Sequence, residues 1–104
     1  MQISAIILLL LVSFGQGSSI FRKAADFVSS AAPVPASNET RLRVYALYNQ
    51  ATRGDCPEQL DGPTDPIRRL KLVAWCGHRG MTKEDAMMKY VALIDELAPG
   101  WRNA

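Results

Sequence analysis

The chain has 104 residues, of which 48% are hydrophobic, and its formal net charge is +2. This length allows one domain, the hydrophobic content excludes a disordered chain, and so small a charge gives no support to nucleic-acid binding. We therefore expect a single small folded domain that has no nucleic-acid partner.

The first 20 residues carry no charged side chain, and residues 5–12 (AIILLLLV) are continuously apolar. Small residues follow at positions 15, 17, 18 and 19. An apolar core of this length ahead of small residues is typical of a cleaved signal peptide. We assign residues 1–17 to this leader and residues 18–104 to the folded domain, which a cleaved leader would place in the secretory pathway or outside the cell.

A membrane anchor is the alternative for the leader, because no Lys or Arg precedes its apolar core. As a helix, residues 1–20 would be about 30 Å long, enough to span a bilayer. Arg22 and Lys23 are the first charges after it, so the positive-inside rule would leave the domain in the cytosol. A buried core helix is the least favoured reading, since the rest of the chain is too small to surround it.

The pattern beyond residue 20 is helical, with no sustained alternation of the kind that predicts strands. Ser18 or Ser19 can cap a first helix, SIFRKAADFVSSAA, which ends before Pro33 and Pro35. Its apolar stripe consists of Ile20, Ala24, Phe27, Val28 and Ala31.

A second helix begins at a cap formed by Ser37 or Asn38, runs to about Thr52 and stops at Gly54. It has two largely apolar sides, one made of Leu42, Tyr45, Ala46 and Asn49, the other of Val44, Leu47, Tyr48 and Ala51. A surface helix needs only one apolar stripe, so we expect both sides of this helix to contact something.

A loop from Asp55 to Asp65 follows. It is long for a small helical domain, and long structured loops often carry function. Asp65 before Pro66 is a strong start signal for a third helix, PIRRLKLVAWC, which stops at Gly77.

Thr82 with Asp85 resembles a capping box and begins a fourth helix, which Pro99 and Gly100 end. Its apolar stripe consists of Met87, Tyr90, Val91, Ile94 and Leu97. Four short helices predict an all-α fold, a small four-helix up-and-down bundle, and we expect a monomer.

Lys71 stands on the same predicted face of the third helix as Ile67, Leu70 and Ala74, where an apolar residue would fit the pattern. The pattern favours a lysine whose stem packs on the bundle while its amine reaches water. The alternative is an ammonium at the edge of an apolar groove that meets a phosphate or carboxylate.

Two cysteines, Cys56 and Cys76, could form a disulfide if the domain is exported. Two ordinary half-buried thiols are favoured unless export is shown. With His78 as the only histidine, we expect no metal site and no cofactor. Since neither cysteine belongs to a recognisable nucleophile–base motif, we identify no catalytic residue and expect no enzyme.

Four strings, in order and with matching spacing, resemble the acyl-CoA-binding protein family. They are FRKAADFV (Phe21 to Val28), YALYNQATRGD (Tyr45 to Asp55), KLVAW (Lys71 to Trp75) and GMTKEDAMMKY (Gly80 to Tyr90). The resemblance covers nearly all of the chain beyond the leader. It implies a four-helix bundle that binds and carries long-chain acyl-CoA esters without a covalent bond.

The resemblance also implies the ligand-binding residues. Tyr45 would pack by the adenine, Lys71 and Tyr90 would contact the phosphorylated nucleotide, and Tyr48 is the second tyrosine of the motif. Leu42, on the same side of the helix as Tyr45, is a further candidate.

The chain departs from the family pattern at two positions. Asn49 stands where the family has a lysine that faces the ribose phosphate, so one charge-assisted bond would be missing. Arg41 or Arg53 is a candidate to supply charge instead, and Asn49 could still donate a neutral hydrogen bond. Leu72 replaces the family's first tryptophan. The alternative function is therefore an exported helical interaction module of the same fold with weakened or lost binding.

Overall fold

The computed structural model describes residues 18–30, 34–57 and 65–103. These ranges hold four α-helices, one short 3-10 helix and no strand, which confirms the expected all-α fold. The elements are an N-terminal helix (residues 18–30), α2 (Asn38–Arg53), α3 (Pro66–Cys76), α4 (Lys83–Leu97) and the 3-10 helix η1 (Trp101–Asn103).

The leader, residues 1–17, lies outside the described residues, so its assignment stays a prediction. Within the ranges that the structure does describe, none of the helices combines the length and the apolar character needed to cross a membrane.

The helix ends follow from local chemistry, as predicted. Ser37, Asp65 and Thr82 cap α2, α3 and α4, and each side chain accepts a hydrogen bond of 3.0–3.1 Å from a backbone N–H of the first turn. Gly54 ends α2 with φ of 81°, a conformation that residues with a Cβ rarely adopt.

The N-terminal helix presents its predicted stripe to the core, with Ala24 fully buried and Ile20, Phe27 and Val28 packed beside it. The predicted cap is wrong, because residues 18 and 19 are both already helical. The last predicted stripe residue, at position 31, lies outside the described residues.

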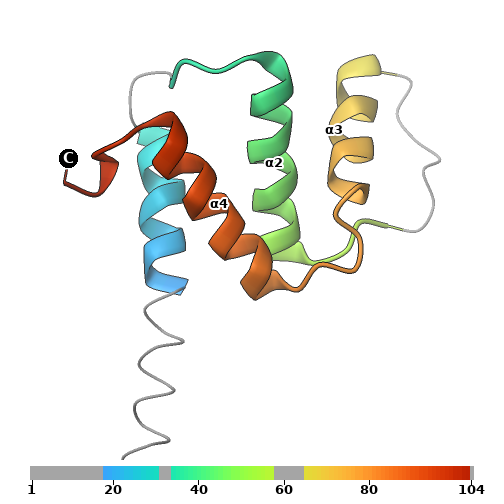
Figure 1. Ribbon diagram of the computed structural model, residues 1–104. Coiled ribbons are helices and arrows are strands. Elements are labelled where there is room, and N and C mark those ends of the chain that lie inside the picture. Colours follow the sequence, from blue (N-terminus) through green and yellow to red (C-terminus); the bar gives the residue numbers. More distant parts are fainter. Residues whose placement is uncertain (1–17, 31–33, 58–64, 104) are drawn as a thin grey trace, which may run out of the picture.

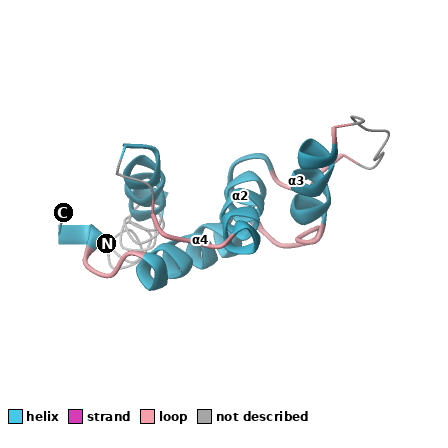
Figure 2. Cartoon of the chain, turned by 90° about the horizontal axis from the view of Figure 1, so that it is seen from above, coloured by secondary structure: helices cyan, strands magenta, loops and turns pink. Residues whose placement is uncertain are grey.

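α2 is the central helix, since it packs against both α3 and α4. Seen from above in Figure 2, the N-terminal helix, α2 and α3 stand side by side, and α4 lies across the first two. α3 therefore occupies the edge of the molecule.

The helix directions do not alternate throughout. In Figure 1 both α2 and α3 descend, so these two neighbours are parallel. Most of the predicted loop between α2 and α3, residues 58–64, lies outside the described residues.

The core lies between the N-terminal helix, α2 and α4, with Trp101 of η1 as an additional member. Its buried residues are Phe21, Ala24, Leu47, Ala51, Ala86, Tyr90, Val91, Leu93, Ile94 and Trp101. Tyr90, Val91 and Ile94 come from the predicted stripe of α4, which is confirmed. Trp101 was not anticipated; its ring lies 5.9 Å from that of Phe27, and its Nε1 donates to Asp95 at 2.7 Å.

The predicted core face of α3 is wrong. Ile67 and Leu70, expected to be buried, are 64% and 55% exposed, and Val73 is 51% exposed. Trp75 is the one residue of α3 that is buried. An edge helix needs only a narrow contact with its neighbour, and here that contact falls on the side of Trp75.

Candidate functional site

A cavity of about 550 Å³ opens between the N-terminal helix, α2, α4 and the segment that precedes α2. It is lined by Ala25, Val28, Ser29, Val34, Ala36, Arg41, Val44, Tyr45, Tyr48, Tyr90, Ile94 and Leu97. The cavity takes Tyr45 from one predicted apolar side of α2 and Val44 and Tyr48 from the other. Leu47 and Ala51 lie in the core, so the two predicted sides do not divide between core and cavity.

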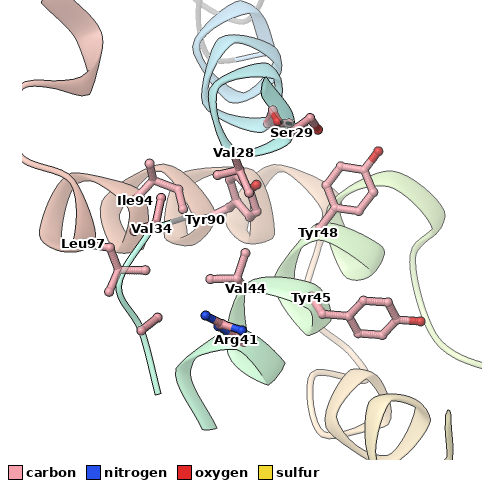
Figure 3. Close-up of a pocket in the computed structure, with 12 residues that line it drawn as sticks. Val28, Ser29, Val34, Arg41, Val44, Tyr45, Tyr48, Tyr90, Ile94 and Leu97 are labelled. Carbon is pink, nitrogen blue, oxygen red and sulfur yellow. Dashed lines mark hydrogen bonds between the residues drawn. The ribbon is translucent and has the colours of Figure 1, made fainter. Parts of the chain in front are cut away.

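The two ends of the cavity differ in chemistry. Figure 3 shows aliphatic side chains gathered at one end and tyrosine rings at the other, with Val34, Ile94 and Leu97 opposite Tyr45 and Tyr48. An apolar tail and a polar, aromatic head would therefore find matching surfaces within one site.

Tyr90 forms the centre of an aromatic group. Its ring meets that of Phe21 edge-on at 5.1 Å between centroids and lies 6.2 Å from that of Tyr48. Burial raises the pKa of Tyr90 to about 12. The phenol is therefore neutral at physiological pH and available as a hydrogen-bond donor.

Lys71 is not among the residues that line the cavity, but it reaches from α3 to Tyr45, which is one of them. Its Nζ lies 5.3 Å from the centroid of the Tyr45 ring, a cation–π contact. The side chain of Tyr45 points from α2 toward α3 (Figure 3). The family resemblance predicted that both residues contact the same ligand, and the structure places them next to each other.

Arg41 adds a second cation at the cavity wall, below Val44 in Figure 3. Arg41 is exposed, so its guanidinium can contact an anionic group at the opening of the cavity. Of the two arginines considered as replacements for the family's lysine, Arg41 is the one that lines the cavity.

Asn49 faces elsewhere. It is 5% exposed, its Nδ2 donates to the carbonyl of Tyr45 at 3.0 Å, and its Oδ1 accepts from Arg53 at 3.3 Å. The guanidinium of Arg53 also lies 5.2 Å from the Trp75 ring centroid. These polar groups therefore serve the α2–α3 contact, and neither they nor Leu42 line the cavity.

The end of the string Tyr45 to Asp55 has a structural role that sequence reasoning missed. Gln50 is fully buried, and its Nε2 donates to Asp55 Oδ1 and to the carbonyl of Met81, both at 2.8 Å. The backbone N–H of Gly80 donates to the same carboxylate oxygen at 2.9 Å. That bond, followed by the bond from Gln50, lowers the pKa of Asp55. These hydrogen bonds connect the end of α2 to the turn before α4.

Cys56 and Cys76 form a disulfide, which corrects the preference for two thiols. The bond joins the chain after α2 to the last residue of α3. Beside it, the indole N–H of Trp75 donates to the carbonyl of Gly54 at 2.8 Å. Together they fix the lower end of α3, so that its position relative to α2, and hence that of Lys71, is restrained.

Among the described residues no group of three potential metal ligands comes together, and His78 does not line the cavity. What the site contains is an apolar cavity, aromatic rings and two bordering cations. The fold and the site thus define an all-α binding protein for a ligand with an apolar part and an anionic part.

Comparison with known proteins gives the family. The profile described as "Acyl CoA binding protein" matches residues 18–94. The chain belongs to the acyl-CoA-binding protein family.

Relatives support this assignment over most of their length. The chain is 43% identical to the diazepam-binding inhibitor-like 5 of Mus musculus over 63 residues, 61% of this chain and 72% of that protein. It is 38% identical to the acyl-CoA-binding protein of Saccharomyces cerevisiae over 80 residues, 77% of this chain and 91% of that protein. The solution structure of an acyl-CoA-binding protein from Babesia bovis matches with a TM-score of 0.68 and 42% identity, covering 80% of this chain and 94% of that one.

Proposed function

We propose that this protein binds long-chain fatty acyl-CoA esters non-covalently and carries or buffers them without turning them over. The observation that carries the proposal is the cavity with an aliphatic end and an aromatic, cation-bordered end. Family membership supports it, since the yeast and Babesia bovis relatives are acyl-CoA-binding proteins by name.

In this proposal the acyl chain lies on the aliphatic end, beside Val34, Ile94 and Leu97. The nucleotide lies at the other end, where Tyr45 stacks with the base and Lys71 and Arg41 meet phosphates. The hydroxyl of Tyr90 donates a hydrogen bond to the ligand. Each methylene buried contributes up to about 0.8 kcal/mol, so longer chains should bind more tightly until the cavity is filled.

Calorimetric titration with palmitoyl-CoA, free CoA and palmitate tests the proposal. We expect palmitoyl-CoA to bind far more tightly than either part alone, because only the ester uses both ends of the cavity. Equal affinity for palmitate would indicate a general lipid site and contradict it. Incubation with palmitoyl-CoA should release no CoA thiol; sustained release would show an enzyme.

One observation favours a second candidate, an exported interaction module that has lost ligand binding. Disulfides such as Cys56–Cys76 are typical of oxidising compartments, where acyl-CoA is not expected to be abundant. Thiol counting on protein from its native source tests this candidate, since two free thiols would show that the native protein has no disulfide. Lack of palmitoyl-CoA binding by the bridged protein would favour this candidate over the carrier.

For the leader, we propose cleavage near residue 17 and entry into the secretory pathway, with a retained anchor and a cytosol-facing domain as the alternative. Membrane association through residues 1–20 belongs to the second case. N-terminal sequencing of the mature protein distinguishes the two. Light scattering on the mature protein tests the accompanying proposal that it is a monomer.

A further inference from the structure

A second groove of about 430 Å³ lies on a different side of α2 from the cavity. It is lined by Arg43, Leu47, His78, Met81, Lys89, Ala92, Leu93 and Glu96. None of these residues lines the first cavity. The proposed acyl-CoA site therefore leaves this groove unexplained.

The groove gathers basic side chains from three separate segments. Arg43 comes from α2, His78 from the turn before α4, and Lys89 from α4, against a single acid, Glu96. The one ion pair found among the described residues is that of Arg102 with Asp95, so neither Arg43 nor Lys89 is neutralised by a described carboxylate. An excess of cations remains around the groove.

Partial burial is the main influence on His78, and the nearby cations add a smaller one. Burial, followed by repulsion from Lys89 and Arg43, lowers the pKa of its imidazole. The groove is thus partly screened from water and electropositive, which are the conditions under which an oxyanion is attracted most strongly. Met81 and Ala92 supply an apolar surface beside the cations.

We propose that this groove is a second ligand site, for a small organic anion. Its carboxylate or phosphate lies among Arg43, His78 and Lys89, and its short apolar part rests on Met81 and Ala92. The site is independent of the acyl-CoA cavity, because the two share no lining residue.

The single histidine allows a direct test by NMR on the full chain, at constant ionic strength. Inorganic phosphate, acetate and hexanoate are titrated separately while the Hε1 resonance of His78 is followed through pH. A bound anion stabilises the imidazolium, so we expect each probe to raise the pKa of His78. We expect hexanoate to bind more tightly than acetate, because only hexanoate reaches the apolar surface.

Arg43→Gln and Lys89→Gln each remove one charge-assisted contact and should weaken the response about tenfold. Without a probe, both variants should raise the pKa of His78, because a repelling cation is gone. Circular dichroism spectra that match the unaltered chain would show that the variants are folded, because unfolding would also raise the pKa of His78. Lys23→Gln removes an exposed charge from the N-terminal helix, outside the groove, and should respond like the unaltered chain.

A His78 resonance that no probe shifts would overturn the proposal. So would an equal response in Arg43→Gln, Lys89→Gln and Lys23→Gln, which would show general screening by ions. Equal affinity for acetate and hexanoate would show that the apolar surface does not contribute to binding. It would contradict the part of the proposal that gives the ligand an apolar part.

Discussion

The ammonium of Lys71 lies 5.3 Å from the ring centroid of Tyr45, which joins the edge helix α3 to the cavity wall on α2. Such contacts contribute about 0.5–1 kcal/mol when exposed. The contact places a cation beside an aromatic ring before any ligand arrives. A phosphorylated ligand could then use both groups with little reorganisation.

Replacement of Lys71 by Ala should weaken palmitoyl-CoA binding by about tenfold or more, because a charge-assisted bond to phosphate contributes at least about 1.4 kcal/mol. Palmitate affinity should change less, since palmitate has one carboxylate and no phosphate. Calorimetric titration measures both. Lys23→Ala, an exposed lysine on the N-terminal helix, is the matched control. An unaltered palmitoyl-CoA affinity would show that Lys71 contacts only Tyr45 and water.

Arg41→Gln should also weaken palmitoyl-CoA binding, by about tenfold, if its guanidinium replaces the lysine absent at position 49. Asn49 cannot fill this role while its Nδ2 is bound to the carbonyl of Tyr45. Arg22→Gln removes an exposed arginine outside the cavity and serves as the control. Equal affinities of the two variants would exclude Arg41 from the site.

Replacement of both Cys56 and Cys76 by Ser should lower the free energy of unfolding by about 2–4 kcal/mol, the usual contribution of a disulfide. Because the bond fixes α3, palmitoyl-CoA affinity should fall as well. Urea denaturation and calorimetry measure the two effects. A phosphine reductant should reproduce them in the unaltered chain and have no effect on the double variant. Identical unfolding curves before and after reduction would contradict this role.

Asp55 should make the protein sensitive to acid. Its pKa is lowered from 3.8 by the hydrogen bonds from Gly80 and Gln50, which stabilise the carboxylate in the folded state. This stabilisation is present above the unfolded-state pKa and is lost as the pH falls through the folded-state pKa. The stability difference between the unaltered chain and Asp55→Asn should therefore shrink as the pH falls below about 4.

Thermal unfolding at a series of pH values measures this difference. Asp26→Asn, at an exposed position of the N-terminal helix, is the control. A difference that stays constant from neutral to acidic pH would show that the charge of Asp55 has no effect on stability.

Trp101→Ala should destabilise the fold by about 3 kcal/mol, because it removes a large buried side chain from the core. Trp101→Phe retains most of the packing and loses the bond to Asp95, so its cost should be nearer 1 kcal/mol. Urea denaturation followed by circular dichroism compares the two. Equal and small effects would place Trp101 outside the cooperative core.

The bounds of α2, α3 and α4 could be predicted because their signals are local. Asp65 followed by Pro66 starts α3 and Gly77 follows its end, and each acts through its own backbone or the adjacent turn. The buried side of α3 could not be predicted in this way. Ile67 and Leu70 are exposed because α3 is an edge helix, and the sequence pattern of a helix does not contain its place in the bundle.

Only part of the candidate site could be predicted, because the sequence pattern does not show which way a polar side chain of a helix turns. The structure brings Lys71 and Tyr45 into contact and places Tyr48 and Tyr90 on the cavity, while Asn49 turns to the backbone. A polar residue can face a ligand or satisfy its own helix, and the pattern is the same in both cases. Trp101 follows Pro99 and Gly100 in a tail too short to show any periodicity.

The disulfide has a consequence for cleavage of the chain. The whole of α3, and the connection that precedes it, lies between Cys56 and Cys76. A protease that cuts a single peptide bond in this interval leaves both fragments in one covalent molecule. Such a nicked protein would keep its mobility on a non-reducing gel and separate into two bands only after reduction.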